Sequence, residues 1–352
     1  RLSALWKAPA VCASWGWSAP RPLPITTALP MAVGSLILNV TNLIDSATIQ
    51  NRLAYAVEKA PDVIKGMYST QLLESGIADS QIVKYLYGVY GETLDFKNLV
   101  PTITMTLGIS AIPIISAAWA QKDSKTIKTT VESVIRVTML LALPVGFGLA
   151  AVSYNLLNMF YPEASAVIGA PILATYGLTI FLFAVSSPIT NMLQALGRTD
   201  IPLKALCVGA VVKIILNYVL IGNPSINING APVGSIACYV IVVGINLFSI
   251  IKITGVKVNF ASVFFKPFAC SAISALTALV TVKVFTNILG GFGDADKMIN
   301  GSSIALVIAV AAAVLVYVLA LLFMKALSKD DMEMLPKGEK IAKKLEKLGF
   351  LG

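Results

Sequence analysis

The sequence contains no histidine and only four cysteines among its 352 residues. Cys207, Cys238 and Cys270 lie in apolar stretches, where a cysteine behaves as a small hydrophobic residue, and no two cysteines form a CxxC pair. Without histidine, the chain lacks the usual general base for a serine or cysteine nucleophile and the usual partner of cysteine in zinc sites. We therefore expect no metal centre, no cofactor and no histidine-dependent enzyme.

Charged residues are also scarce. They make up 13% of the chain against 57% hydrophobic residues, and the mean hydropathy is +0.80. Soluble domains carry about 25% charged residues. No Walker lysine motif or Rossmann glycine fingerprint occurs, so nothing indicates an ATP-driven pump or a dinucleotide enzyme. This composition predicts a membrane protein.

Eight long apolar stretches account for the hydropathy. A membrane span needs roughly 20 apolar residues to cross about 30 Å of hydrocarbon. Because the bilayer core offers no water to the backbone, we expect helices, and a barrel would show shorter segments with alternating polarity. The predicted spans are Leu23–Ile49, Leu99–Trp119, Val131–Tyr154, Val167–Ala195, Leu203–Ile221, Gly230–Ile251, Phe264–Phe285 and Ile304–Leu327.

Lysine and arginine gather in every second gap between these spans. They are frequent in the lead-in, in the gaps after the second, fourth and sixth spans, and in the tail, whereas Tyr154–Ala166 and Gly222–Asn229 contain none. Basic residues are retained on the cytoplasmic side of a membrane. We therefore expect a multi-pass protein of the cytoplasmic membrane with both termini in the cytoplasm. The formal charge of +9 reflects this asymmetry and calls for no nucleic-acid partner.

The chain divides into four regions by composition. Residues 1–21 form an irregular lead-in that we interpret as a truncated or aberrant start. Residues 22–253 hold six spans and a long connection of mixed charge at 52–92, which we place outside the cytoplasm. Residues 254–327 hold two more spans. Residues 328–352 have apolar residues at helical spacing and lysines on the opposite face. This pattern is typical of a surface helix on the cytoplasmic leaflet or of a solubilising tail.

Polar side chains interrupt the first predicted span. Asn39, Asn42 and Asp45 follow one helix face, and Arg52 lies one to two turns further along. An ionisable group inside a membrane costs about 2.5–3.5 kcal/mol on insertion scales, so it usually faces a cavity or a partner. Two interpretations are open: a hydrophilic vestibule in which Arg52 receives an anionic group such as phosphate, or an ordinary helix end at the membrane interface.

Lys213 lies midway through Leu203–Ile221, with Asn217 four residues later on the same face. This position is too deep for its ammonium group to reach the interface easily. We expect Lys213 to face the bundle interior, where ligand contact and an internal structural bond are both open.

Several local motifs, in order, resemble one family. Residues 29–53 contain Leu-Pro, Asn-Leu-Ile-Asp and Asn-Arg-Leu, and resemble the seventh helix of lipid II flippases and stage V sporulation protein B-like proteins. Residues 99–116, with Leu-Val-Pro and Ala-Ile-Pro-Ile-Ile-Ser, resemble their eighth helix. Residues 194–235, with Gln-Ala-Leu-Gly-Arg and Asn-Gly-Ala-Pro-Val-Gly-Ser, resemble helices ten to twelve. This is the polysaccharide-biosynthesis branch of the multidrug/oligosaccharidyl-lipid/polysaccharide exporter superfamily.

The resemblance implies a fold. That family has two lobes of six helices around a central cavity, often with two extra helices at the end. Matching the chain to it over roughly Pro22–Leu327 gives helices seven to fourteen, with the first lobe missing. The fold class implied is an all-α polytopic membrane protein of about eight transmembrane helices, forming the C-terminal lobe plus two extra helices.

The resemblance also implies a function: translocation of a lipid-linked oligosaccharide or peptidoglycan precursor, a polyprenyl-pyrophosphate-linked sugar, by alternating access. The partners implied are that substrate, membrane lipids and cell-envelope synthesis proteins. In lipid II flippases an arginine in an Asp-Arg-Leu pattern belongs to a cationic cavity, and Asn51-Arg52-Leu53 matches it with Asn for Asp. The substrate-binding candidates are Arg52, Asn42, Asp45, Asn39, Lys213 and Asn217.

Three alternatives stay open, of which a membrane-embedded glycosyltransferase ranks last because the acids of residues 52–92 show no recognised catalytic motif. A drug/cation antiporter of the same superfamily would favour a carboxylate-lined cavity; Asp45 is the one deep acid, and Lys213 and Arg52 argue against this assignment. A non-transporting scaffold for envelope synthesis would also fit a basic tail and a single lobe.

Overall fold

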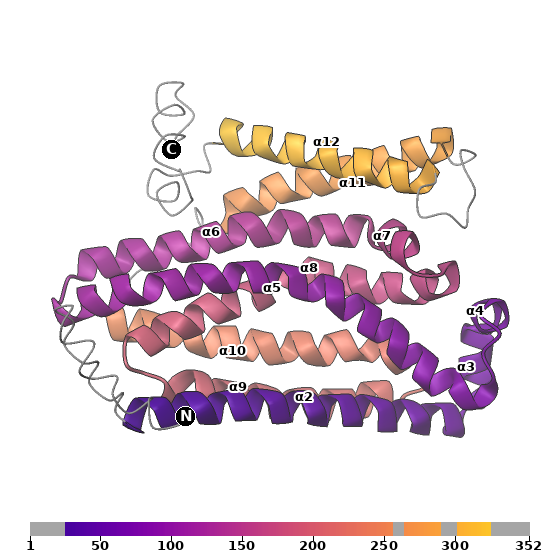
Figure 1. The fold of residues 1–352 in the computed structure, drawn as a ribbon, viewed down its shortest axis with the longest axis horizontal. Helices are drawn as coiled ribbons and strands as arrows, with labels where there is room; N and C mark the ends of the chain where they lie inside the picture. Colours follow the sequence, from indigo (N-terminus) through magenta and orange to yellow (C-terminus); the bar gives the residue numbers. More distant parts are fainter. Residues whose placement is uncertain (1–24, 256–263, 290–300, 325–352) are drawn as a thin grey trace, which may run out of the picture.

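A computed structural model describes residues 25–255, 264–289 and 301–324, with side chains from Asn42 onward. The lead-in at 1–21 and the basic tail at 328–352 lie outside the described residues. Every regular element in the described part is helical (Figure 1). The prediction of an all-α polytopic membrane protein is therefore confirmed.

Long helices make up most of the structure (Figure 1). They are α2 (Ile25–Lys59), α5 (Ile82–Ala120), α6 (Ser124–Ala151), α8 (Glu163–Ala195), α9 (Asp200–Ile221), α10 (Ala231–Thr254), α11 (Lys266–Leu289) and α12 (Gly301–Phe323). Short helices connect them: α3 (Pro61–Met67), α4 (Ser69–Glu74), α7 (Ser153–Phe160), and the 3-10 turns η2 (Asp79–Gln81) and η3 (Asn227–Gly230).

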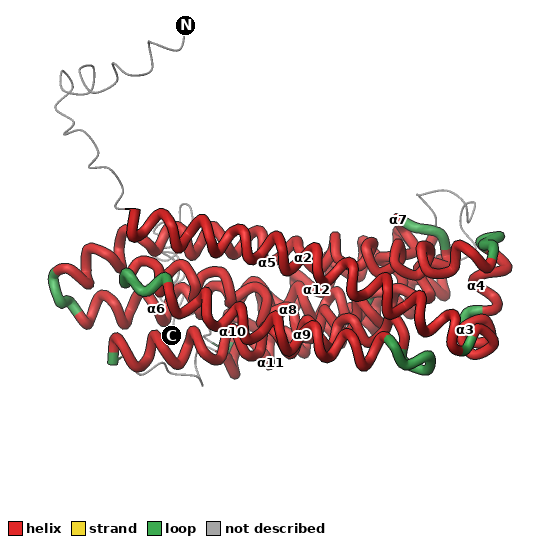
Figure 2. Tube along the Cα trace, turned by 90° about the horizontal axis from the view of Figure 1, so that it is seen from below, coloured by secondary structure: helices red, strands yellow, loops and turns green. Residues whose placement is uncertain are grey.

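Among the described residues, seven helices are long and apolar enough to cross a membrane. They correspond to the predicted spans from the second to the eighth. The first predicted span, Leu23–Ile49, coincides with α2. The long helices run side by side along one axis, so the connections gather at the two ends of the bundle (Figures 1 and 2). The predicted cytoplasmic and extracytoplasmic gaps fall at opposite ends.

The connection at 52–92 is more helical than the hydropathy pattern indicated. α2 continues to Lys59, and α5 begins at Ile82 instead of Leu99. Most charged residues of this connection are exposed, whereas Leu53 and Leu86 are fully buried against the bundle. Only residues 60–81 connect the two helices, and they hold α3, α4 and η2. The placement of this connection outside the cytoplasm stays a prediction.

The connection is fixed to the end of the bundle by a buried tyrosine. The Tyr68 hydroxyl donates to Asn227 Oδ1 over 2.6 Å, and Asn229 Nδ2 donates to the same hydroxyl over 3.4 Å. Burial raises the pKa of Tyr68, so the phenol keeps the proton that it donates. Asn227 is itself fully buried and adopts a left-handed φ of 45°. These hydrogen bonds therefore join the α2–α5 connection to the α9–α10 connection.

α8 lies at the centre of the bundle and packs against α5, α6, α7 and α10. α9 packs between α10 and α2, whereas α11 and α12 form a pair that joins the bundle mainly through α6. This arrangement leaves α2 at the edge of the bundle, held chiefly along α9 (Figure 1).

The α6–α8 crossing depends on two glycines. A Cβ on Gly146 would lie 2.5 Å from the Gly177 carbonyl oxygen and would also collide with Ile180. A Cβ on Gly177 would lie 2.6 Å from the Gly146 oxygen. The two backbones are therefore in direct contact, which is how small residues bring membrane helices together.

We expect Gly146→Ala to destabilise the protein by about 1–3 kcal/mol, because α6 must move away from α8 to admit the methyl group. Gly148, half a turn away on the same helix, has open space at its Cβ position and provides the control. Gly148→Ala should leave the protein as stable or make it slightly more stable. Thermal unfolding of purified protein in detergent measures both. Equal midpoints for the two variants would contradict the close crossing.

Candidate functional site

An ion pair joins α2 to α9 in the interior of the bundle. Lys213 Nζ donates to Asp45 Oδ2 over 2.7 Å, and Asn217 Nδ2 donates to Asp45 Oδ1 over 2.6 Å. The side chains of Lys213 and Asp45 are each 14% exposed. Both carboxylate oxygens thus accept a short hydrogen bond, one of them charge-assisted. The structure brings together three of the six candidate residues, from segments far apart in the sequence.

The neighbouring helix α10 fixes the position of Asn217. Asn217 is fully buried, and its Oδ1 lies where a Cβ on Gly234 would be. Because Gly234 has no side chain, α10 approaches α9 closely enough to cover the asparagine. The amide is therefore held with its Nδ2 toward Asp45.

Arg52 lies apart from the ion pair, seven residues along α2, or about 10 Å at 1.5 Å per residue. Its Nε donates to the carbonyl oxygen of Tyr218 over 3.1 Å. Its guanidinium carbon is 3.8 Å from the ring centroid of Tyr218 and 4.2 Å from that of Tyr55, both at cation–π distance. The guanidinium also covers Gly222. In this structure Arg52 clamps α2 to the end of α9.

The other two candidates lie on α2. Asn42 is exposed, one turn before Asp45. Asn39 lies in the helix one turn earlier, and its side chain is outside the described ones. A polar stripe along α2 thus leads from Asn42 to the ion pair.

A second interior lysine, Lys97 on α5, was missed by the sequence analysis. Its ammonium group lies 5.0 Å from the ring centroid of Tyr176 and 4.9 Å from that of Phe183, both on α8. It is also close enough to Lys213 and Asp45 to interact with them electrostatically. The predicted connection ended at residue 92 and the predicted span began at Leu99, so Lys97 was assigned to neither. Extending the helix toward the N-terminus would have found it.

Hydroxyl groups continue the polar interior. The hydroxyls of Tyr90 and Tyr176 are 3.1 Å apart, and Tyr176 donates to Ser235 Oγ over 3.4 Å. On α2, the Ser46 hydroxyl is 2.6 Å from that of Tyr87 on α5. These contacts add hydroxyl groups from α2, α5, α8 and α10 to the polar interior.

The cluster combines charges of both signs. Lys97 and Lys213 supply two positive charges and Asp45 one negative charge, so the cluster carries a net charge of +1 in an apolar bundle. Within the described residues, no group of three or more cysteine, aspartate or glutamate side chains lies together as a metal site.

Comparisons with known proteins find relatives among membrane proteins. Residues 88–219 match the MatE family. The chain is 23% identical over 278 residues to the uncharacterized membrane protein YabM of Bacillus subtilis (strain 168), covering 77% of this chain and 49% of that protein. It is 23% identical over 263 residues to stage V sporulation protein B of the same organism, covering 74% and 48%. The chain spans about half the length of these relatives.

Two further matches are named flippases. The chain is 24% identical over 122 residues to the lipid II flippase MurJ of Bacillus subtilis (strain 168), covering 34% of this chain and 22% of that protein. A solved structure of lipid II flippase MurJ in an inward closed conformation matches with a TM-score of 0.49 at 18% identity, covering 69% of this chain and 47% of that one. The resemblance to the flippase and stage V sporulation protein B branch is confirmed by these relatives.

We predict that Asp45→Asn and Lys213→Met each destabilise the protein by about 3 kcal/mol, because each leaves a charge without its partner inside the bundle. The double variant should lose much less than the sum, since no lone charge remains. Equilibrium unfolding in SDS gives the coupling energy.

The exposed pair of Lys65 and Asp79, 2.6 Å apart with side chains 43% and 76% exposed, is the matched control. Its coupling should stay below about 1 kcal/mol because solvent screens it. Equal coupling energies for the two pairs would show that Asp45 and Lys213 are not effectively buried.

Proposed function

We propose that this chain is part of a membrane translocator for polyprenyl-pyrophosphate-linked saccharides, a transporter and not an enzyme. The observation that carries the proposal is the presence of Lys97 and Lys213 close together inside the bundle, with Asp45 bound to Lys213. A diphosphate is the chemical group that needs such a cationic lining to cross a membrane interior. The name of one relative, a lipid II flippase, supports the same substrate class.

The mechanism we infer is an exchange of ion-pair partners. In this structure Asp45 neutralises Lys213, so neither charge is isolated in low dielectric. An entering diphosphate would replace Asp45 as the partner of Lys213 and would also meet Lys97. When the head group leaves, the ion pair between Asp45 and Lys213 would form again. The pair thus lowers the cost of the empty state without binding the substrate permanently.

Arg52 and the stripe of Asn39 and Asn42 extend this path along α2. We propose that Arg52 contacts the head group nearer the end of the bundle predicted to be extracytoplasmic, after release from the Tyr218 carbonyl. The proposed location is the cytoplasmic membrane with cytoplasmic termini. The lipid tail would stay in the bilayer, and cell-envelope synthesis proteins are the proposed further partners.

The proposal predicts that Lys97→Gln and Lys213→Gln each slow translocation about tenfold or more, because each removes a charge-assisted contact worth about 1.5–3 kcal/mol. The assay follows a fluorescent polyprenyl-pyrophosphate sugar in proteoliposomes made with the full-length gene product. Lys84→Gln, which removes an exposed lysine from the same helix as Lys97, should leave the rate unchanged.

Normal rates in both folded lysine variants would overturn the cationic path. Export of a cationic dye, abolished by Asp45→Asn and with no translocation of lipid-linked sugars, would instead establish the antiporter alternative. A protein that moves neither substrate but retains its binding partners would be a scaffold.

For Arg52 we predict that Arg52→Ala lowers the rate of the same assay, whereas Lys59→Gln, at the exposed end of α2, does not. Arg52→Lys should restore little, because a lysine cannot stack between two tyrosine rings and bind a phosphate edge together. A folded Arg52→Ala variant with an unchanged rate would limit Arg52 to its structural contact with α9.

A further inference from the structure

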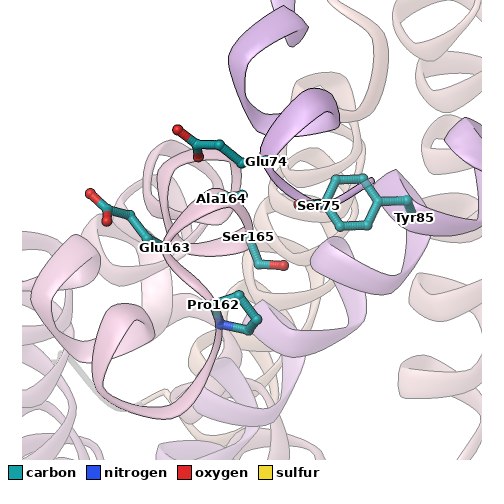
Figure 3. A pocket seen from close by; sticks show the side chains of 7 residues that line it. All are labelled: Glu74, Ser75, Tyr85, Pro162, Glu163, Ala164 and Ser165. Atoms are coloured by element: carbon teal, nitrogen blue, oxygen red, sulfur yellow. The ribbon is translucent and has the colours of Figure 1, made fainter. Parts of the chain in front are cut away.

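A cavity of about 430 Å³ lies away from the lysine cluster, between α4, the start of α5 and the N-terminus of α8 (Figure 3). Its lining comes from three chain segments: Glu74 and Ser75 after α4, Tyr85 on α5, and Pro162, Glu163, Ala164 and Ser165 at the start of α8. This volume is within the usual range of small-molecule sites. It lies at the end of the bundle that we predict to be extracytoplasmic.

The N-terminus of α8 supplies hydrogen-bond donors to this cavity. The first amides of a helix have no partner within the helix, and the N-cap residue Pro162 makes no side-chain cap. Ser165 is 4% exposed, makes no hydrogen bond within the described residues and lines the cavity. Figure 3 shows its hydroxyl between the rings of Pro162 and Tyr85. The hydroxyl reaches the cavity and is free to bond to a ligand or to water there.

Carboxylates supply the acceptors. Glu74 and Glu163 point to the same side of the cavity, away from Tyr85 (Figure 3). Tyr154 donates to Glu163 Oε1 over 3.0 Å and thereby orients it. The lining contains no lysine or arginine, so the two carboxylates disfavour an anion in spite of the helix N-terminus.

The ring of Tyr85 gives the cavity a flat apolar surface. Its hydroxyl lies 3.1 Å from Ser75 Oγ, which fixes the ring across the cavity from Pro162. An aromatic ring beside hydroxyl groups and helix amides, with carboxylates at the exposed rim, suits a sugar, because its hydroxyls bond to the polar groups and its C–H face covers the ring.

We propose that this cavity binds a neutral or amino sugar. This inference rests on the proposed function. The site, which lies where α4 meets the start of α8, would hold part of the saccharide head group after it has crossed the bundle. Glu74 and Glu163 would accept from sugar hydroxyls or an amine, and Ser165 would donate to or accept from a ring substituent. A phosphorylated sugar would bind less well than its neutral counterpart.

The test is saturation-transfer NMR and titration of the full chain in nanodiscs with glucosamine, N-acetylglucosamine and N-acetylglucosamine 1-phosphate. We expect saturable binding of the first two and weaker binding of the third. Glu74→Gln and Tyr85→Ala should weaken binding about tenfold, since each removes a principal contact. Ser165→Ala should weaken it several-fold, and Glu58→Gln, an exposed acid on α2, should have no effect.

Absence of saturable sugar binding to folded protein would overturn the proposal. Tighter binding of the phosphorylated sugar, or saturable binding of Ca²⁺ alone, would overturn it in favour of an anion or cation site. The two proposals can fail separately. If the protein binds sugar, also as Lys97→Gln, but translocates no lipid-linked sugar, the proposed function fails and the sugar site stands. If it translocates lipid-linked sugar but binds no free sugar, the sugar site alone fails.

Discussion

A lysine ammonium and an aspartate carboxylate meet 2.7 Å apart between apolar helices, and the position of α2 depends on this contact. Neither charge could enter the bundle alone without a cost of several kcal/mol. Paired, and with Asn217 on the second carboxylate oxygen, they attach an edge helix to α9. Further along, Arg52 and the Tyr68–Asn227 contact attach the same helix and its connection to the end of the bundle. These links are polar and therefore reversible, unlike the glycine crossing that joins α6 to α8.

The bundle therefore has a closely packed part and a part held by polar contacts. Close backbone contact and buried aliphatic side chains make α5, α6 and α8 a rigid frame. Lys97, Tyr90 and Tyr176 stand on that frame and face the ion pair. Lys97 therefore stands on this frame, whereas Lys213 is bound to Asp45 on the edge helix α2. In the proposed exchange, a diphosphate would meet Lys97 in a fixed position and would release Lys213 from Asp45.

The sequence predicted the fold better than the site. Runs of apolar residues are long enough to define the spans, because a bilayer imposes length and polarity together. Asp45 and Lys213 were recognised as deep charges, but 168 residues separate them, and no local pattern showed that they pair. Lys97 was missed because hydropathy falls where α5 continues beyond the apolar run. Arg52 was chosen from a motif, and its stacking between Tyr55 and Tyr218 required the packing of α2 on α9.

The central claim is that Lys97 and Lys213 contact the diphosphate directly, and ³¹P–¹⁵N dipolar recoupling by solid-state NMR tests it most directly. The full-length gene product, with ¹⁵N at lysine Nζ, would be reconstituted with a polyprenyl-pyrophosphate sugar. We predict two dephased lysine signals. One should be lost in Lys97→Gln and the other in Lys213→Gln, and both should persist in the control Lys84→Gln. Dephasing that survives both substitutions, or none in a protein that translocates the lipid, would contradict the account.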